Sequence, residues 1–337
     1  MKKIKDTVTF DDVLLVPQYS EVVSRKSIDL SSELSENIVL DLPIIGAPMD
    51  TVVNSSMASA LNSVGCLGVM HRYNTKEMQA LTMGYVTGTK AAAIGITGDY
   101  LERAVHLVDN GITVLCVDVA HGHHALAKHA LKETRSAVGK DIHIMAGNVA
   151  TLKAFNDLSD WGADSIRVGI GGGSICSTRI ETGHGVPTLQ SVMDCSMSDR
   201  PAKLIADGGI KTSGDIVKAL AAGADFIMAG SLLAGTMEAP GSVVYVNGEQ
   251  YKSYRGMASV EAQIDWRGHT ASVEGVSHMV PYKGSVTTII KNLEGGIRSG
   301  LSYSGALNIN ELQSKAQFIK QTSAGLYESK THIKARY

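Results

Sequence analysis

One short stretch of the chain places a thiol directly after a run of glycines. Residues 169–179 read GIGGGSICSTR, so four glycines precede Cys176, and Thr178 follows it. Glycines let the backbone approach a ligand closely and adopt positive φ angles, and consecutive backbone N–H groups can bind an anion. A thiol in this position suits nucleophilic catalysis through a covalent intermediate. We therefore interpret residues 169–179 as an active-site loop; a plain turn at a strand end is the alternative.

The other cysteines and the histidines do not indicate a metal centre. Cys66, Cys116 and Cys195 are far apart in the sequence and form no C-x-x-C pair, which argues against zinc sites and disulfides. Residues 121–124 read HGHH, and two histidines at i, i+2 can bind zinc, but no H-E-x-x-H pattern accompanies them. We favour a cofactor-lining loop with hydrogen-bonded histidines over a zinc site.

The composition argues against several classes of partner. The 31 basic and 33 acidic residues nearly cancel, so no basic surface for nucleic acid is indicated. No apolar run approaches the roughly 18 residues of a membrane span. The basic segment Met1–Asp6 is not followed by the apolar region of a secretory signal. We therefore expect a protein of the reducing cytoplasm that binds neither nucleic acid nor membrane.

Eight short apolar runs could position the cysteine loop. Near-continuous apolar runs are typical of parallel strands covered on both faces. The runs cover residues 42–47, 66–70, 91–96, 113–118, 142–148, 165–169, 204–209 and 226–231. Helical spacing of apolar residues over 100–110, 152–161 and 213–222 predicts helices between them, two of which end before a repeated Gly-Ala-Asp.

Alternating strands and helices over this length predict an α/β fold, a (β/α)8 or TIM barrel, forming a single domain over residues 1–337. A doubly wound open sheet is the runner-up. Polar residues follow the predicted strands at the ends where TIM barrels hold their active sites. The loops after the seventh and eighth strands are glycine-rich, a usual phosphate site in this architecture, and predict a phosphorylated small substrate.

A long segment of weak periodicity follows the eighth strand. Residues 251–284, which we call the flap, carry Arg255, Asp265, Trp266, Glu274 and several histidines, groups suited to acid–base chemistry. A loop of this length inside a compact domain is usually functional or disordered. We expect a mobile lid over the barrel mouth.

Several of these segments together resemble the IMP dehydrogenase and GMP reductase family over nearly the whole chain. The motifs are APMDTV at 47–52, AGNV at 146–149, GGGSICSTR at 171–179, IADGGI at 205–210, GSLLAGT at 230–236, YRGM at 254–257 and VPYKG at 280–284. The resemblance implies the TIM-barrel fold, usually assembled as a homotetramer, and a purine mononucleotide as substrate.

The resemblance also implies roles for individual residues. Cys176 would attack C2 of the purine, with Thr178 as its partner and Glu274 facing the base. The nucleotide would be held by Met49, Ser174, Asp207, Gly209, Gly230, Ser231, Tyr254, Gly256 and Met257. Asp118, Asn148 and Gly169 would lie towards the nicotinamide cofactor. In members that use potassium, the backbone carbonyls of Gly171, Gly173 and Cys176 would coordinate it.

The flap distinguishes the two reactions of the family. In the family that this chain resembles, the dehydrogenases (IMP, NAD and water to XMP and NADH) carry a long flap with an adjacent Arg-Tyr pair. No such pair lies between Met257 and Glu274, and residues 265–268 look more like the aromatic-x-Gly element of the reductase. We therefore predict GMP reductase (GMP and NADPH to IMP, ammonia and NADP).

Two alternatives stay open. An IMP dehydrogenase is favoured by residues 47–50, 230–231, 254–257 and 324–329, which look closer to that branch. It would lack CBS domains, because only residues 74–90 join the second and third strands. The other is a catalytically silent nucleotide-binding barrel, against which Cys176 and Thr178 argue.

Overall fold

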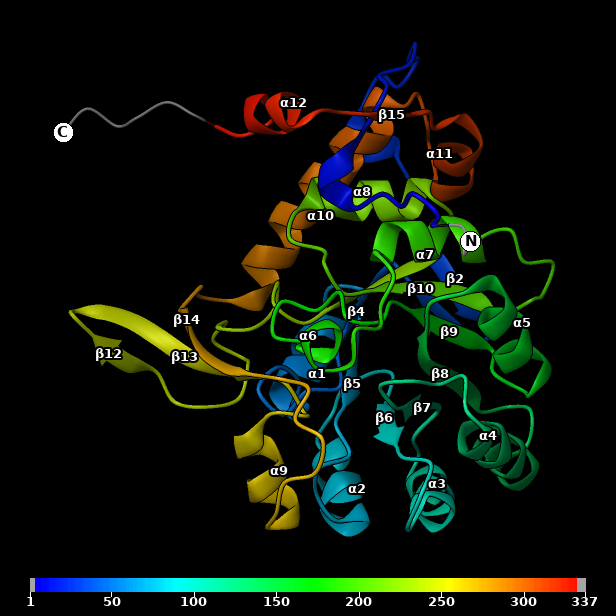
Figure 1. The fold of residues 1–337 in the computed structure, drawn as a ribbon, viewed down its shortest axis with the longest axis vertical. Coiled ribbons are helices and arrows are strands. Elements are labelled where there is room, and N and C mark those ends of the chain that lie inside the picture. The colour runs from blue at the N-terminus through cyan, green and yellow to red at the C-terminus, as the bar shows by residue number, and fades with distance from the viewer. Residues whose placement is uncertain (1–3, 332–337) are drawn as a thin grey trace.

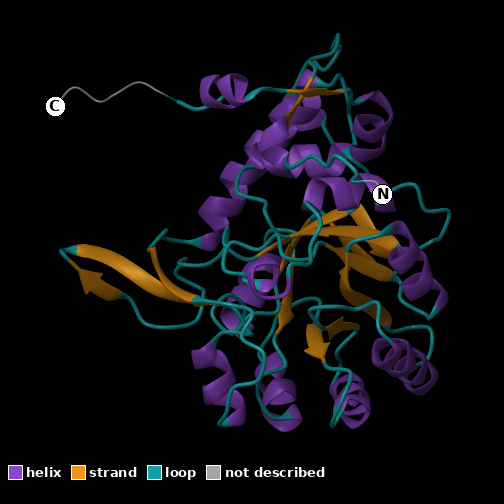
Figure 2. Cartoon of the chain, in the orientation of Figure 1, coloured by secondary structure: helices purple, strands orange, loops and turns teal. Residues whose placement is uncertain are grey.

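A closed barrel of parallel strands forms the centre of the protein, which was analysed as a computed structural model describing residues 4–331. Its eight strands follow one another around the barrel in chain order (Figures 1 and 2). They are β4 (Ile44–Gly46), β5 (Leu67–Met70), β6 (Ala91–Ile94), β7 (Val114–Asp118), β8 (His143–Val149), β9 (Ser165–Val168), β10 (Lys203–Asp207) and β11 (Phe226–Ala229). Each lies where an apolar run predicted it, and the TIM-barrel prediction is confirmed.

Side chains alternate between the inside and the outside of this barrel. Ile45, Leu67 and Phe226 belong to the buried cluster within the barrel, whereas Ile44 and Ile227 belong to the cluster between strands and helices. Both clusters are fully apolar in these strands, which explains why the runs in the sequence look continuous rather than alternating.

Helices surround the barrel and complete the βα repeats. They are α1 (Ser55–Asn62), α2 (Lys76–Gly84), α3 (Tyr100–Asp109), α4 (Ala125–Val138), α5 (Leu152–Asp160), α7 (Thr188–Cys195), α8 (Ser213–Ala221) and α10 (Val286–Tyr303). The three predicted helices are α3, α5 and α8, each ending one residue earlier than predicted. The N-cap of α8 is Thr212, whose side chain forms a capping box with Asp215.

The segments before β4 and after α10 form two additional two-stranded sheets. The hairpin of β2 (Ser32–Ser35) and β3 (Ile38–Leu40) buries Leu34 and Leu40 in the inner core. Strand β1 (Val13–Leu15), between the short 3-10 helices at Phe10–Asp12 and Arg25–Ser27, pairs with β15 (Phe318–Lys320). Helices α11 (Ile309–Lys315) and α12 (Ser323–Glu328) flank β15. Residues 1–3, part of the segment considered for a secretory signal, lie outside the described residues.

The flap contains regular structure that the sequence did not predict. Strands β12 (Val244–Val246), β13 (Glu249–Arg255) and β14 (Ser277–Pro281) form an antiparallel sheet that projects from the barrel at the left of Figure 1. Between β13 and β14 the chain forms helix α9 (Val260–Arg267), which lies near α2 in the same view. The expected long loop is therefore two paired strands and a helix. Across residues 4–331, no helix has the length and apolar character that crossing a membrane requires.

Candidate active site

The cysteine loop leaves β9 and packs against the end of β10. Gly169 has φ +147°, and a Cβ there would lie 1.9 Å from the carbonyl oxygen of Asp207. Gly208 has φ +95°, and its Cβ would lie 3.0 Å from the backbone nitrogen of Gly173. Only glycine permits this contact between two backbones. The glycines thus bring the loop carrying Cys176 next to the carboxyl end of β10.

A hydrogen-bonded chain links Cys176 to the flap. The Cys176 thiol donates to Thr178 Oγ1 at 3.2 Å, and Thr178 Oγ1 donates to Glu274 Oε2 at 2.7 Å. The backbone joins the same two segments, because the Ser177 amide donates to the Glu274 carbonyl at 3.0 Å. Thr178 is the first residue of the short helix α6 (Thr178–Thr182). Residues almost a hundred positions apart in the sequence therefore form one continuous polar path.

All the residues that the sequence analysis placed in the site line one cavity of about 280 Å3 at the barrel mouth. They come from the loops after β4, β7, β8, β9, β10 and β11 and from the flap. In chain order they are Met49, Asp118, Asn148, Gly169, Gly171, Gly173, Ser174, Cys176, Thr178, Asp207, Gly209, Gly230, Ser231, Tyr254, Gly256, Met257 and Glu274. The structure thus brings all of these residues together around one cavity.

Tyr254 and Gly230 form one side of this cavity. A Cβ at Gly230 would lie 2.9 Å from Tyr254 Oη, so the glycine leaves room for the tyrosine hydroxyl beside Ser174. Tyr254 is only 4% exposed, and burial raises the pKa of its hydroxyl to about 12. The hydroxyl therefore remains a hydrogen-bond donor across the physiological pH range.

Arg167 at the floor of the cavity was missed by the sequence analysis. Its guanidinium pairs with Asp118 at 2.5 Å and with Asp207 at 2.9 Å. Burial alone would lower the pKa of Arg167, but the charges of the two aspartates raise it above its ordinary value. Asn148 Nδ2 donates to Asp207 Oδ2 at 2.8 Å, whereas its buried Oδ1 accepts no hydrogen bond in the described residues. The sequence did contain a signal for Arg167, because it is a charged residue within an otherwise apolar strand.

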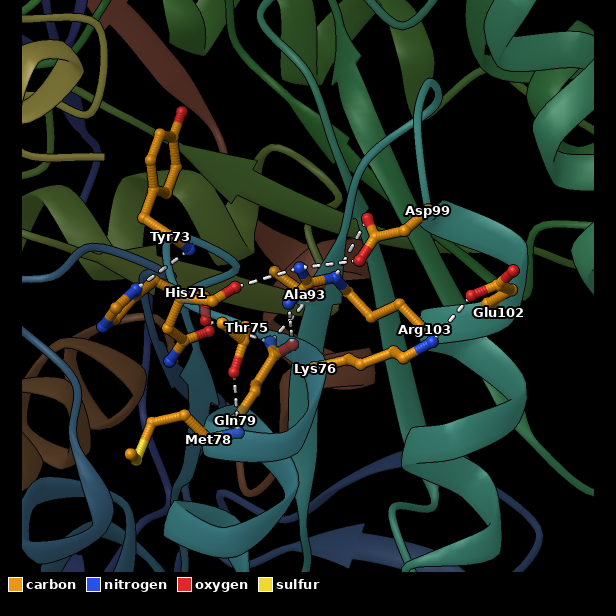
Figure 3. Close-up of polar contacts among 11 residues, drawn as sticks. His71, Tyr73, Thr75, Lys76, Met78, Gln79, Ala93, Asp99, Glu102 and Arg103 are labelled. Atoms are coloured by element: carbon orange, nitrogen blue, oxygen red, sulfur yellow. Dashed lines mark hydrogen bonds and ion pairs between the residues drawn. The ribbon is translucent and has the colours of Figure 1, made fainter. Parts of the chain in front are cut away.

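The loop after β5 is held by two buried polar side chains (Figure 3). Gln79 of α2 is fully buried and donates to the carbonyls of His71 at 3.0 Å and Ala93 at 2.9 Å. Arg103 of α3 donates to Gln79 Oε1 at 2.8 Å and to the Asn74 carbonyl at 2.9 Å. Because both Gln79 and Arg103 donate to backbone carbonyls of the loop, this network fixes the loop at the edge of the cavity.

This loop carries Arg72 and Tyr73, which face the flap. The rings of Tyr73 and Trp266 lie edge to face with centroids 4.6 Å apart, and the Arg72 guanidinium lies 5.0 Å from the Tyr73 ring centre. Both residues line the cavity. Within residues 4–331 the Arg72 side chain forms no salt bridge, so its charge faces the cavity region without a carboxylate partner.

Arg255 fastens the flap to the barrel. Its guanidinium pairs with Asp50 after β4 at 2.5 Å and with Asp265 of α9 at 2.6 Å. The hydrogen bonds and charges of these carboxylates raise the pKa of Arg255 further above its ordinary value. Arg255 therefore bridges the barrel rim and the flap helix.

The histidines of the loop after β7 contact neighbouring side chains and backbone groups outside the cavity. His123 Nε2 lies 2.7 Å from Asp157 Oδ2 and stacks on Trp161, and the His124 ring accepts the Leu126 amide as N-cap of α4. In the part of the chain that the structure describes, no cluster of histidine, cysteine or carboxylate side chains could hold a metal ion. Val119 and Ala120 of this loop, rather than the histidines, line the cavity.

The closed (β/α)8 barrel and a polar cavity at the carboxyl ends of its strands define a TIM-barrel enzyme. The chain belongs to the IMP dehydrogenase/GMP reductase family, because the model of that family's catalytic domain matches residues 7–332. Its relatives indicate an NAD(P)-dependent oxidoreductase acting on a purine mononucleotide.

Relatives come from both branches of the family. The inosine-5′-monophosphate dehydrogenase of Nitrosopumilus maritimus is 36% identical over 471 aligned positions, covering 98% of this chain and 99% of that protein. The GMP reductase of Leishmania major is 33% identical over 481 positions, covering 98% and 97%. Both alignments exceed the 337 residues of this chain, so both relatives contain segments that it lacks. The missing segments therefore do not separate the branches.

A solved structure resembles the whole barrel. GMP reductase from Trypanosoma brucei, crystallised in complex with guanosine 5′-monophosphate, superposes with a TM-score of 0.92 at 30% identity. The match covers 98% of this chain and 99% of that one.

Proposed function

We propose that this protein is a GMP reductase, converting GMP and NADPH to IMP, ammonia and NADP. The observation that carries the proposal is the chain from Cys176 through Thr178 to Glu274, which is complete without a flap arginine. Within residues 4–331 no arginine forms a hydrogen bond or ion pair with any of these three residues. The dehydrogenase must activate a water to hydrolyse its adduct, whereas the reductase has no hydrolytic step.

The polar chain fits the proton movements of a deamination. When the Cys176 sulfur bonds to C2 of GMP, its proton passes to Thr178 Oγ1 and the hydroxyl proton of Thr178 passes to Glu274. Return of that proton to the amino group lets the C2–N bond break and ammonia leave. A hydride then adds to C2, the C–S bond breaks with its electron pair on sulfur, and IMP is released. The thiolate regains a proton from solvent, so each turnover consumes one proton besides GMP and NADPH, and all residues return to their starting charges.

The residues around this chain would hold the nucleotide. We propose that the 5′-phosphate accepts hydrogen bonds from Ser174, Ser231 and Tyr254 and from the amides of Gly209 and Gly230, all of which line the cavity. The ribose hydroxyls would bond to Asp207, which Arg167 and Asn148 hold in place. Met49, Gly256 and Met257 would lie against the base.

The opposite side of the cavity fits a nicotinamide cofactor, which supplies the hydride when it is bound. The buried Oδ1 of Asn148 lacks a partner in the described residues and could accept a carboxamide N–H, beside Asp118 and Gly169. Arg72, which has no carboxylate partner there, supports NADPH over NADH because a guanidinium binds phosphate well. Comparing turnover of Arg72→Leu with NADPH and with NADH tests this preference.

The cysteine loop also offers ligands for potassium. Within residues 4–331, the Gly171 and Cys176 carbonyls accept no hydrogen bond, and Gly173 accepts only the Cys176 amide at 3.2 Å. Carbonyl oxygens are suitable ligands for a hard cation. We propose that these three carbonyls hold K⁺, and that activity measured in KCl exceeds activity in NaCl at equal ionic strength.

An IMP dehydrogenase is the second proposal. It is favoured by the closer match of residues 254–257 and 324–329 to that branch. Incubating the protein with GMP and NADPH, and separately with IMP and NAD, separates the two by the absorbance of the reduced nicotinamide. We expect NADPH consumption only in the first mixture; NADH formation only in the second would refute the reductase. A Cys176→Ser variant that still turned over nucleotide would refute the covalent step.

We also propose that residues 1–337 act as one catalytic domain, with the flap as a lid, in a cytoplasmic homotetramer. Support for the lid is that the flap contacts the barrel at Asp50, Tyr73 and Thr178, around the cavity mouth. Light scattering after size-exclusion chromatography tests the tetramer: a mass other than four chains would contradict it.

A further inference from the structure

A glutamine of the flap helix is buried although it does not line the cavity. Gln263 of α9 is 4% exposed. Its Nε2 donates to the carbonyls of Ala258 and Ser272, both at 3.0 Å, and its Oε1 accepts the Ala271 amide at 2.8 Å. Both amide protons and the amide oxygen are therefore engaged, all with backbone groups.

These three contacts enclose the segment that ends at Glu274. Ala258 precedes α9, whereas Ala271 and Ser272 follow it. The Ala258 carbonyl also accepts the Glu274 amide, at 3.2 Å. Gln263 thus ties the beginning of the flap helix to the returning chain just before the residue that binds Thr178.

We propose that Gln263 is the positioning residue for Glu274, and through it for the proton path to Cys176. The turn between Gly268 and Glu274 forms no helix or strand, so the hydrogen bonds of Gln263 take the place of regular pairing there. This proposal rests on the proposed role of Glu274 but not on the direction of the reaction.

Loss of this side chain has a distinctive consequence for Cys176. While Glu274 accepts the single hydroxyl proton of Thr178, that hydroxyl can only accept a hydrogen bond from the thiol. If Glu274 moves away, the Thr178 hydroxyl can donate to the sulfur instead, and the thiol loses its fixed acceptor. Turnover should fall while the reactivity of Cys176 towards an alkylating agent rises.

Iodoacetamide reports on Cys176 because the other thiols are shielded. Cys66, Cys116 and Cys195 are buried, and burial raises the pKa of each to about 12. We expect Gln263→Met to lower kcat about tenfold or more and to raise the alkylation rate at pH 7 several-fold. Gln263→Glu, which keeps the acceptor but loses both donors, should change both rates in the same direction. The matched control is Gln250→Met, because the Gln250 side chain is exposed and, within residues 4–331, bonds only to the Tyr245 hydroxyl.

The decisive measurement is the double variant with Glu274→Gln. If Gln263 acts through Glu274, adding Gln263→Met to Glu274→Gln changes neither kcat nor the alkylation profile further. Full effects of Gln263→Met in that background, or unchanged rates in the single variant, would overturn the proposal. Alkylation is measured without nucleotide, so it is informative even if GMP and NADPH are not the substrates; turnover would then be followed with IMP and NAD.

Discussion

Replacing Arg167 tests whether a buried charge holds the substrate side of the barrel together. In Arg167→Met, the carboxylates of Asp118 and Asp207 lose a guanidinium that lies 2.5 and 2.9 Å away. The arginine side chain is 8% exposed and both aspartates are 17% exposed, so water replaces little of the lost interaction. Breaking a buried ion pair by removing one partner typically costs about 3–5 kcal/mol. We expect a loss of this size in the free energy of unfolding at pH 7.

The chain provides a matched control on its surface. Arg200 also pairs with two aspartates, Asp160 and Asp199, each at 2.7 Å, but these side chains are 37–80% exposed. Surface pairs contribute little, so Arg200→Met should leave the unfolding free energy nearly unchanged. Urea unfolding followed by circular dichroism compares the variants, with the m-value as the check that the same surface is exposed.

The two variants together decide the question. A deficit below about 1 kcal/mol for Arg167→Met at pH 7, or an equal deficit for Arg200→Met, would refute the reasoning.

Further substitutions test the proposed roles at the cavity. Cys176→Ser should lower turnover by about 10³-fold or more while calorimetry shows nucleotide binding retained, because a serine hydroxyl is a poor nucleophile at its ordinary pKa. Tyr254→Phe should raise the KM for GMP about tenfold, as loss of a hydrogen bond to a charged group predicts. Since burial raises the pKa of Tyr254 to about 12, its contribution to stability is lost only as pH rises from about 10 to 12, a drop that the phenylalanine variant should lack. Arg255→Leu should speed trypsin cleavage within the flap and raise the KM for GMP, and unchanged cleavage would contradict its role as a bridge to Asp50 and Asp265.

The barrel was predictable because its signals are local. Each parallel strand is a short apolar run, and each ends at a glycine or a polar residue that the barrel places on one rim. Asp118, Asn148 and Asp207 follow three different strands, yet the topology alone predicts that they meet. The βα repeat thus converts positions in the sequence into positions in space.

The contacts of the flap were not predictable, because they join residues that are far apart in the sequence. Strands β13 and β14 pair Tyr254 with His278 across an intervening helix, and no local pattern gives that register. Similarly, nothing near Trp266 in the sequence indicates Tyr73 as its neighbour. Arg167 was visible as a charge in an apolar strand, but its partners depend on which face of the strand is inward. Such non-local pairings depend on tertiary packing rather than on propensity or spacing.

The position of the flap explains why its sequence bears on the direction of the reaction. Three of its contacts with the barrel lie around the cavity: Arg255 joins the loop after β4, Trp266 packs on Tyr73 after β5, and Glu274 binds Thr178 after β9. Only the last of these contacts reaches the thiol. A flap side chain that activated water as a base would have to lie beside the Thr178 hydroxyl or the adduct on Cys176. Glu274 already occupies the position beside that hydroxyl. In the proposed reductase mechanism this site moves a proton to a departing amine, and within residues 4–331 Glu274 is the only flap side chain that forms a hydrogen bond with the Thr178 hydroxyl.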